Sequence, residues 1–152
     1  MVTSAASGVS RGSSLLSKNV INIDASTAST FVSEGSFMRH QLKALVSGKK
    51  MVMTETALGE VQNMMQKAGP KEMARYQRFL ERISIIPDNP SARALGLKVT
   101  KSVGANDIRI FGTADEIGAT TMTGDAKFLR GSSAQGVDFD AILHPSVPLT
   151  GQ

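Results

Sequence analysis

The sequence predicts an α/β protein in which helices cover both faces of a parallel β-sheet. Short apolar segments rich in β-branched residues alternate along the chain with segments whose apolar residues recur at helical spacing. No internal repeat interrupts this alternation. Because a helix between two strands returns the chain to the same edge of a sheet, the strands are expected to run parallel. We therefore expect a three-layer α/β/α sandwich with a central parallel sheet of four to five strands.

Composition limits the protein to one ordinary domain. The chain has 152 residues, of which 41% are hydrophobic and 20% charged, as in globular proteins. We expect a flexible leader or linker at 1–18, a folded domain at 19–145 and a tail at 146–152. The absence of cysteine excludes disulfides and thiolate metal sites. A formal net charge of +4 is a weak indication of a polyanionic partner.

The first half of the chain contains three predicted strands and three predicted helices. The strands are expected at 19–24, 50–54 and 83–86, each with a run of apolar residues. One helix is expected to end near Gly48, and the next two to span 56–68 and about 70–83, with Gly69-Pro70 between them. The helix at 70–83 carries a basic stripe, which consists of Lys71, Arg75, Arg78 and Arg82.

The second half of the chain is organised around one helix and the strand that follows it. Ile108, Phe111, Ala114 and Ile117 recur at helical spacing, with Asn106 and Asp107 placed to cap the helix and Gly118 placed to end it. A short helix is expected before it, at 91–97. A strand at 119–122, a turn at 123–125, a Gly/Ser loop at 131–136 and a last strand at 137–143 should follow.

Acidic residues lie at the ends or beginnings of these elements. Asp24 closes the first strand, and Asp125 follows the strand at 119–122. Glu60 lies in the early turns of one helix, and Asp107 lies at the start of another. Since sites in open α/β sheets form at the carboxyl edge of the strands, these four acids are candidates for one common site.

With these acids the chain resembles the PIN-domain nucleases. The family pattern is an Asp that closes the first strand with a small hydroxyl residue two positions on, then a helical Glu, an Asp that opens a later helix, and a Thr-x-Asp-x-x-Phe segment. The resemblance covers about 19–143, and the segments that match the family pattern are Val20–Ser26, Thr56–Val61, Asn106–Ala114 and Thr123–Phe128. The resemblance implies RNA cleavage by a toxin that a cognate antitoxin or immunity protein controls.

Physical reasoning from the residues points to the same chemistry. Converging carboxylates repel one another unless protons or a cation neutralise them. With oxygen ligands only, the suitable cofactor is Mg²⁺ or Mn²⁺, which could activate water for phosphodiester hydrolysis. The hypothesis is a divalent-metal-dependent endoribonuclease with Asp24, Asp107 and Asp125 as metal ligands. Glu60 would complete the catalytic set, and either Glu60 or Asp125 could orient the attacking water.

Supporting roles are assigned to other side chains. Ser26 and Thr123 could hydrogen-bond to the carboxylates or to bound water. The basic stripe could bind the RNA backbone, although a solvated helix face would show the same pattern. Two other functions stay open, namely a non-catalytic PIN-like module that binds RNA or docks a protein, and an aspartyl-nucleophile phosphatase. A phosphatase of that kind needs a second Asp where this chain has Ser26.

The sequence also bears on localisation and assembly. No apolar run is long enough to cross a bilayer, and the amino terminus lacks a signal-peptide core. We expect the protein to act in the cytoplasm, and the sequence leaves open its delivery as part of a larger exported polypeptide. It also leaves homo-oligomer formation open.

Overall fold

The protein is an α/β/α sandwich around a six-stranded sheet, and the predicted fold class is confirmed. The computed structural model describes residues 10–11 and 19–152. Five strands run parallel, and the short amino-terminal strand pairs antiparallel with the last one. Their order across the sheet is β1-β6-β5-β2-β3-β4. The strands are β1 (Ser10–Arg11), β2 (Val20–Ile23), β3 (Lys50–Thr54), β4 (Ile83–Ile86), β5 (Thr120–Thr123) and β6 (Ala141–Leu143).

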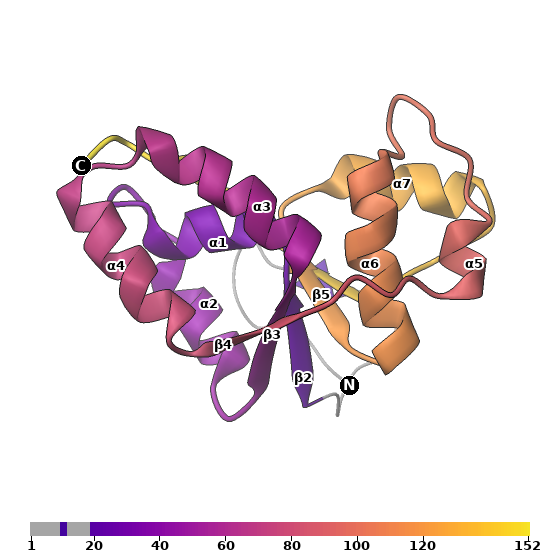
Figure 1. Ribbon diagram of the computed structural model, residues 1–152, viewed down its shortest axis with the longest axis horizontal. Coiled ribbons are helices and arrows are strands. Elements are labelled where there is room, and N and C mark those ends of the chain that lie inside the picture. The colour runs from indigo at the N-terminus through magenta and orange to yellow at the C-terminus, as the bar shows by residue number, and fades with distance from the viewer. Residues whose placement is uncertain (1–9, 12–18) are drawn as a thin grey trace.

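Helices cover the sheet in two groups that lie on its two sides (Figure 1). One group comprises α1 (Ala25–Val32), α2 (Arg39–Val46), α3 (Glu55–Met64) with its 3₁₀ extension η1 (Met65–Lys67), and α4 (Pro70–Leu80). The other comprises α5 (Ala92–Leu95), α6 (Ala105–Ile117) and α7 (Ala126–Ala134). The apolar stripe predicted for α6 is mostly buried, since Ile108, Phe111 and Ala114 are buried while Ile117 at its end is 49% exposed. Within the described residues, no helix is both long and apolar enough to span a membrane.

Several predicted boundaries are wrong. Helix α4 ends at Leu80 rather than at 83 because strand β4 begins at Ile83. Helix α6 begins at Ala105 with Gly104 as its N-cap, so Asn106 and Asp107 lie inside its first turn and do not cap it. Strand β6 begins at Ala141 rather than at 137.

The chain turns after β5 as predicted, but helix α7 replaces most of the Gly/Ser loop predicted at 131–136. The Asp125 side chain caps this helix by accepting a hydrogen bond from the Phe128 backbone N–H at 3.1 Å. Phe128 is fully buried and stacks on Phe111 of α6 at a centroid distance of 4.4 Å. The cap and the buried aromatic residue therefore stabilise a helix here, although Gly131, Ser132 and Ser133 are typical of a loop.

The two ends of the chain differ from simple terminal tails. Residues 10–11 of the predicted leader form β1, and the rest of 1–18 lies outside the described residues. The predicted tail at 146–152 contains no helix or strand, but it packs on α1. The Ser29 and Ser33 hydroxyls donate to the carbonyls of Val147 and Pro148, and Thr30 accepts from the Val147 N–H. These bonds explain why a helix as polar as α1 is almost entirely buried.

A candidate acidic active site

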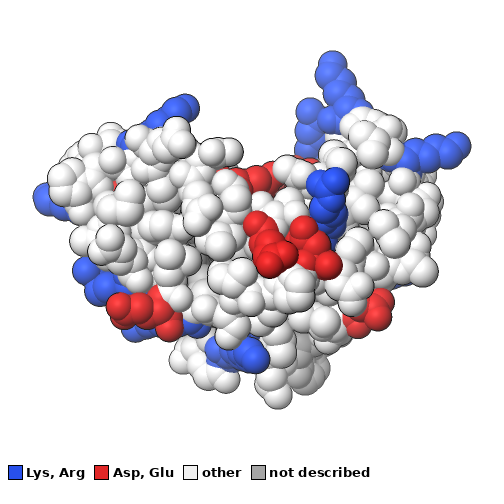
Figure 2. All heavy atoms as spheres, in the orientation of Figure 1, with Lys and Arg blue, Asp and Glu red and all other residues white. Residues whose placement is uncertain are grey.

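The four predicted acids lie at the carboxyl edge of the sheet. Asp24 directly follows β2, and Asp125 lies two residues after the end of β5, which is the neighbour of β2. Glu60 and Asp107 come from α3 and α6, which contact each other although they belong to the two different helix groups. Figure 2 shows acidic side chains in the hollow between the two groups, with a basic side chain beside them. The structure thus brings together residues that are spread over a hundred positions of the sequence.

Asp24 is held in place by three donors. Its side chain is almost completely buried, with 4% of the residue exposed. One carboxylate oxygen accepts from the Ala25 N–H at 2.8 Å, which caps helix α1. The other accepts from the Thr123 hydroxyl at 2.6 Å and from the Ser26 hydroxyl at 3.4 Å. The carboxylate therefore has a fixed position at the end of its strand.

The same two hydroxyls connect Asp24 to the segment that carries Asp125. The Thr123 Oγ1 accepts from the Asp125 N–H at 2.9 Å while it donates to Asp24. Ser26 Oγ accepts from the Gly124 N–H at 2.9 Å. The β5–α7 turn is thereby tied to the β2–α1 turn, and a change at either position would move both carboxylates.

Glu60 and Asp107 line the side of the site that α3 and α6 form. The Glu60 carboxylate accepts from the Asn106 side-chain amide at 3.1 Å, across the gap between the two helices. Asp107 is half-buried, and its carboxylate lies against the backbone turn at Gly104. A methyl group added at Gly104 would approach Asp107 Oδ2 to 3.2 Å. Glycine at this N-cap leaves room for the carboxylate.

The pKa values of Asp24 and Asp107 show that the charges of the four acids act on one another. Burial, helped by the charges of Glu60 and Asp125, raises the pKa of Asp24 to about 6 against the hydrogen bonds from Thr123 and Ala25, which lower it. Burial also raises the pKa of Asp107 to about 7, with the charges of Asp24, Asp125 and Glu60 acting in the same direction. Two of the four carboxyls thus hold protons more readily than exposed acids, which is typical of sites that bind a cation or catalyse proton transfer.

The chemistry of these groups fits a hard divalent cation. All four groups are carboxylates, and a bound cation would offset both the burial of Asp24 and Asp107 and the repulsion among the acids, which together raise these two pKa values. As the side chains stand, no group of three or more His, Asp or Glu residues in the described part of the chain is arranged to hold a metal ion. The site therefore has the charge that a cation needs, and its carboxylates would have to move closer together to coordinate one.

The basic stripe lies away from the acidic site. Arg82 directly precedes β4, and Arg75, Arg78 and Arg82 line a pocket with residues 47–49, which directly precede β3. Since the strands run parallel, this is the amino edge of the sheet, opposite the edge that carries the acids. Lys71 lies at the start of α4, outside the pocket, and its backbone N–H donates to the Gln152 carbonyl. The predicted position of the stripe beside the acids is therefore wrong, while its contact with RNA stays a prediction.

Two residues of the site lie outside the predicted set. Asn106 bridges to Glu60, and Arg109 donates to the Asn106 side-chain oxygen at 2.7 Å. Arg109 places a guanidinium at the margin of the acidic site. The spacing of three residues between Asn106 and Arg109 on one helix was the available sequence signal.

Comparisons with solved structures agree with this fold. The chain is similar to VapBC2 from Rickettsia felis bound to a DNA fragment from their promoter, with a TM-score of 0.57, 19% identity, and coverage of 81% of this chain and 98% of that chain. It is also similar to VapBC-1 from nontypeable Haemophilus influenzae, with a TM-score of 0.52, 12% identity, and coverage of 80% and 96%. At these identities the likeness shows the fold, and it confirms the PIN-like architecture.

A family model also matches the chain. It covers residues 27–152, which include helix α1 from its third residue and every later helix and strand. The chain therefore belongs to the family described as "Protein of unknown function (DUF1308)".

Proposed function

We propose that the protein is a divalent-metal-dependent endoribonuclease of the PIN type. One observation carries the proposal: four acids from four separate elements gather at the carboxyl edge of a PIN-like sheet, where burial and their mutual charges raise the pKa values of Asp24 and Asp107. Burying like charges in this way costs stability in the absence of a cation. A binding site for Mg²⁺ or Mn²⁺ accounts for that cost.

The ligands of the ion would be Asp24, Asp107 and Asp125. When bound, the ion would supply an activated water and would stabilise charge on the phosphate under attack. Thr123 and Ser26 hold the Asp24 carboxylate with one oxygen in a fixed direction. Glu60 or Asp125 would orient the attacking water by accepting its proton. Asn106 keeps the Glu60 side chain in position for that role.

The RNA would approach through the hollow between the two helix groups. Arg109 lies at the margin of the site and could contact a phosphate next to the one that is cleaved. The basic stripe lies at the opposite edge of the sheet, so it could contact only a distant part of a long RNA.

The structural neighbours support the existence of a protein partner that inhibits this chain. Both are structures of VapBC proteins, and the resemblance of this chain to PIN-domain toxins implies an inhibitory partner. By analogy, a cognate antitoxin or immunity protein would bind this chain and block the acidic site.

Cleavage of RNA by the purified protein tests the proposal. We expect cleavage with Mg²⁺ or Mn²⁺, none with excess chelator, and a loss of at least about 100-fold in rate for Asp107→Asn. Asp138→Asn is the matched control, because Asp138 is an exposed acid outside the site and its loss should leave the rate unchanged. Cleavage that survives both the chelator and Asp107→Asn would refute the proposal.

The two alternatives give other results in the same experiments. A non-catalytic module would bind RNA without cutting it under any metal condition. An aspartyl-nucleophile phosphatase would form a trappable phosphoenzyme at Asp24. The Ser26 hydroxyl stands where that mechanism needs an acid, so the phosphatase has less support.

A further inference from the structure

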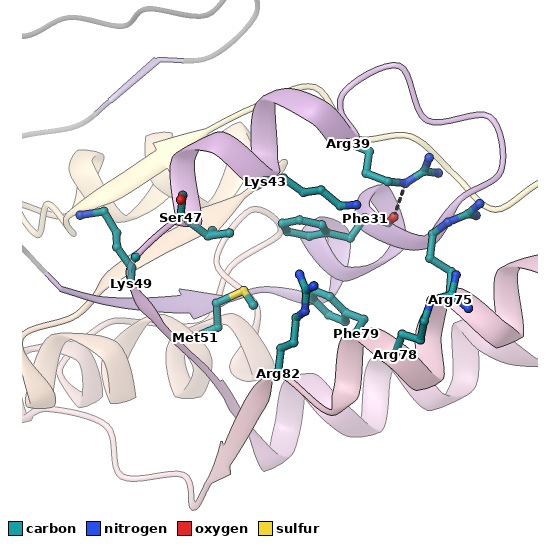
Figure 3. Close-up of a pocket in the computed structure, with 12 residues that line it drawn as sticks. Phe31, Arg39, Lys43, Ser47, Lys49, Met51, Arg75, Arg78, Phe79 and Arg82 are labelled. Atoms are coloured by element: carbon teal, nitrogen blue, oxygen red, sulfur yellow. Dashed lines mark hydrogen bonds between the residues drawn. The ribbon is translucent and has the colours of Figure 1, made fainter.

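A pocket of about 430 Å³ lies between α2 and α4, at the amino edge of the sheet. Its volume lies in the range of small-molecule sites. The pocket is lined by basic and apolar side chains together with Ser47 and Gly48, and by no acidic residue (Figure 3). Its basic residues are Arg39, Lys43, Lys49, Arg75, Arg78 and Arg82. A concave site with this many cations attracts anions of high charge density.

Three of these cations lack a partner that would neutralise them. Lys43, Arg78 and Arg82 are exposed, and none of them forms an ion pair with an acid in residues 10–11 and 19–152. Lys43 lies on α2 and Arg78 on α4, and Arg82 lies in the turn between α4 and β4. In Figure 3 the charged ends of Lys43 and Arg82 point toward the rings of Phe31 and Phe79 from opposite sides. Their charges can therefore reach one bound group together.

The remaining arginines form a fixed wall. Arg39 donates to the carbonyls of Phe31 and Ser33, and Arg75 donates to the Val32 carbonyl at 2.8 Å and pairs with Glu34 at 3.0 Å. Both guanidiniums are thus held by the carboxyl end of α1 and the loop after it. Burial and the neighbouring charge of Arg75 lower the pKa of Arg39, and a bound anion would reverse that effect.

The floor of the pocket is apolar. Phe31 and Phe79 pack together at a centroid distance of 4.9 Å and are 5% and 7% exposed, and Met51 lies beside them. Phosphate oxygens would bind the cations at the rim, and the non-phosphate part of a ligand could cover this floor. Arginine binds phosphate through two parallel hydrogen bonds, which favours it over lysine in such sites.

We propose that this pocket binds a compact ligand with two or more linked phosphate groups, held by Lys43, Arg78 and Arg82. The ligand could be a nucleoside di- or triphosphate or an inorganic polyphosphate, because both present the same chain of phosphates. The site lies at the opposite edge of the sheet from the acids. Binding there does not depend on the nuclease activity proposed above.

Calorimetric titration with inorganic triphosphate, a nucleoside triphosphate and a short single-stranded RNA tests the proposal. The buffer contains chelator and about 0.15 M salt, so that metal does not bridge the ligand and distant charges are screened. We expect one triphosphate per chain, and at least a tenfold loss of affinity when Lys43→Gln is combined with Arg82→Gln. The pair Lys101→Gln and Arg130→Gln removes the same charge from exposed positions outside the pocket and should keep the affinity.

The possible results separate the explanations. Tighter binding of the nucleoside triphosphate than of inorganic triphosphate would support the proposal and identify a nucleotide as the ligand. Equal binding of the two would support the proposal with the phosphate chain alone as the recognised group. Equal losses in the pocket variant and the control variant would overturn the proposal, since they would show diffuse attraction. Absence of triphosphate binding would overturn it too, and so would pocket-dependent binding of RNA alone. Asp107→Asn should bind triphosphate normally, whether or not the acidic site cleaves RNA.

Discussion

The Thr123 hydroxyl donates a 2.6 Å hydrogen bond to the Asp24 carboxylate and accepts one from the Asp125 N–H. This single side chain therefore sets the position of two acids that come from neighbouring strands. It also stabilises the charged form of Asp24 against the effect of burial.

Replacement of Thr123 by Val should disturb the site more than the fold. Loss of the hydroxyl leaves the Asp24 oxygen without its strongest donor, so the pKa of Asp24 should rise further and the activity optimum should move to higher pH. The cost in stability should be about 1–2 kcal/mol, measured by urea unfolding. Thr121→Val is the matched control, because Thr121 lies on the same strand and its hydroxyl accepts from Asn22. That variant should lose similar stability and keep the pH profile of the wild type.

The metal-free protein should become more stable as the solution is acidified through neutrality. Asp24 and Asp107 have pKa values of about 6 and about 7 in the folded state, above the ordinary 3.8 that the unfolded chain retains. The folded state therefore takes up protons that the unfolded state does not, and stability rises as pH falls through about 7 and then about 6. The midpoint of thermal unfolding in chelator should be higher at about pH 5 than at about pH 8.

A variant and a metal titration separate this effect from other titrating groups. Asp107→Asn should be more stable than the wild type in chelator at about pH 8, and its stability should depend less on pH. Millimolar Mg²⁺ should stabilise the wild type more than the variant. A metal-free wild type that loses stability on acidification from about pH 8 to about pH 6 would contradict the claim that folding raises the pKa values of Asp24 and Asp107.

Glu72 should be a principal anchor of the carboxyl-terminal segment. Its fully buried carboxylate accepts from the backbone N–H groups of Glu34, Gly69, Thr150 and Gly151 and from the Thr150 hydroxyl. Glu72→Gln replaces one acceptor oxygen by a donor and should cost on the order of 3 kcal/mol in chemical unfolding. The exposed Glu81→Gln should cost much less.

The pH dependence of Glu72 has the opposite sign to that of the active-site acids. Burial raises the pKa of Glu72, but the backbone donors of Thr150, Glu34, Gly151 and Gly69 outweigh it and bring the pKa to about 2. Its contribution to stability is therefore complete above the ordinary value of 4.5 and is lost as pH falls toward about 2. The stability of Glu72→Gln should accordingly depend less on pH in that range than the stability of the wild type does. An unchanged acid transition would show that other groups control it.

Two helical glycines should respond oppositely to alanine. A methyl group at Gly112 of α6 would lie 2.7 Å from the Cβ atoms of Ala94 and Pro90, so Gly112→Ala should force α5 and α6 apart. We expect a loss of about 1–3 kcal/mol. Gly59 in α3 has open space where its Cβ would lie, so Gly59→Ala should gain about 0.5–1 kcal/mol. Thermal unfolding of both variants measures the difference, and equal effects would contradict the close contact of α5 with α6.

Local sequence patterns predicted the sheet and the position of the acids at its carboxyl edge, for a physical reason. The strand at Val20–Ile23 is a short, mostly apolar run, and its end fixes the position of Asp24 at the carboxyl edge. Helix α7 was missed because Gly131, Ser132 and Ser133 resemble a loop. Gly131 is needed there because a Cβ would lie 2.6 Å from the Ser102 hydroxyl, a contact that no local pattern reveals.

The basic stripe shows the limit of helical periodicity. The spacing of Lys71, Arg75, Arg78 and Arg82 predicted one basic side for a helix at 70–83, although α4 ends at Leu80 and Arg82 lies in the turn after it. It did not determine which edge of the sheet that side approaches, because the answer depends on how α2 and α4 pack. The bridge from Asn106 to Glu60 is likewise a contact between two helices that are far apart in the sequence.

Direct binding of Mn²⁺ tests the central claim that the four acids form one cation site. Calorimetry or electron paramagnetic resonance should detect Mn²⁺ binding to the wild type that weakens as pH falls below about 7, because protons on Asp107 and Asp24 compete with the ion. Asp24→Asn and Asp107→Asn should each abolish this binding, while the exposed Asp138→Asn should leave it unchanged. Mn²⁺ binding of equal strength in all four proteins, or no binding to the wild type, would contradict the claim.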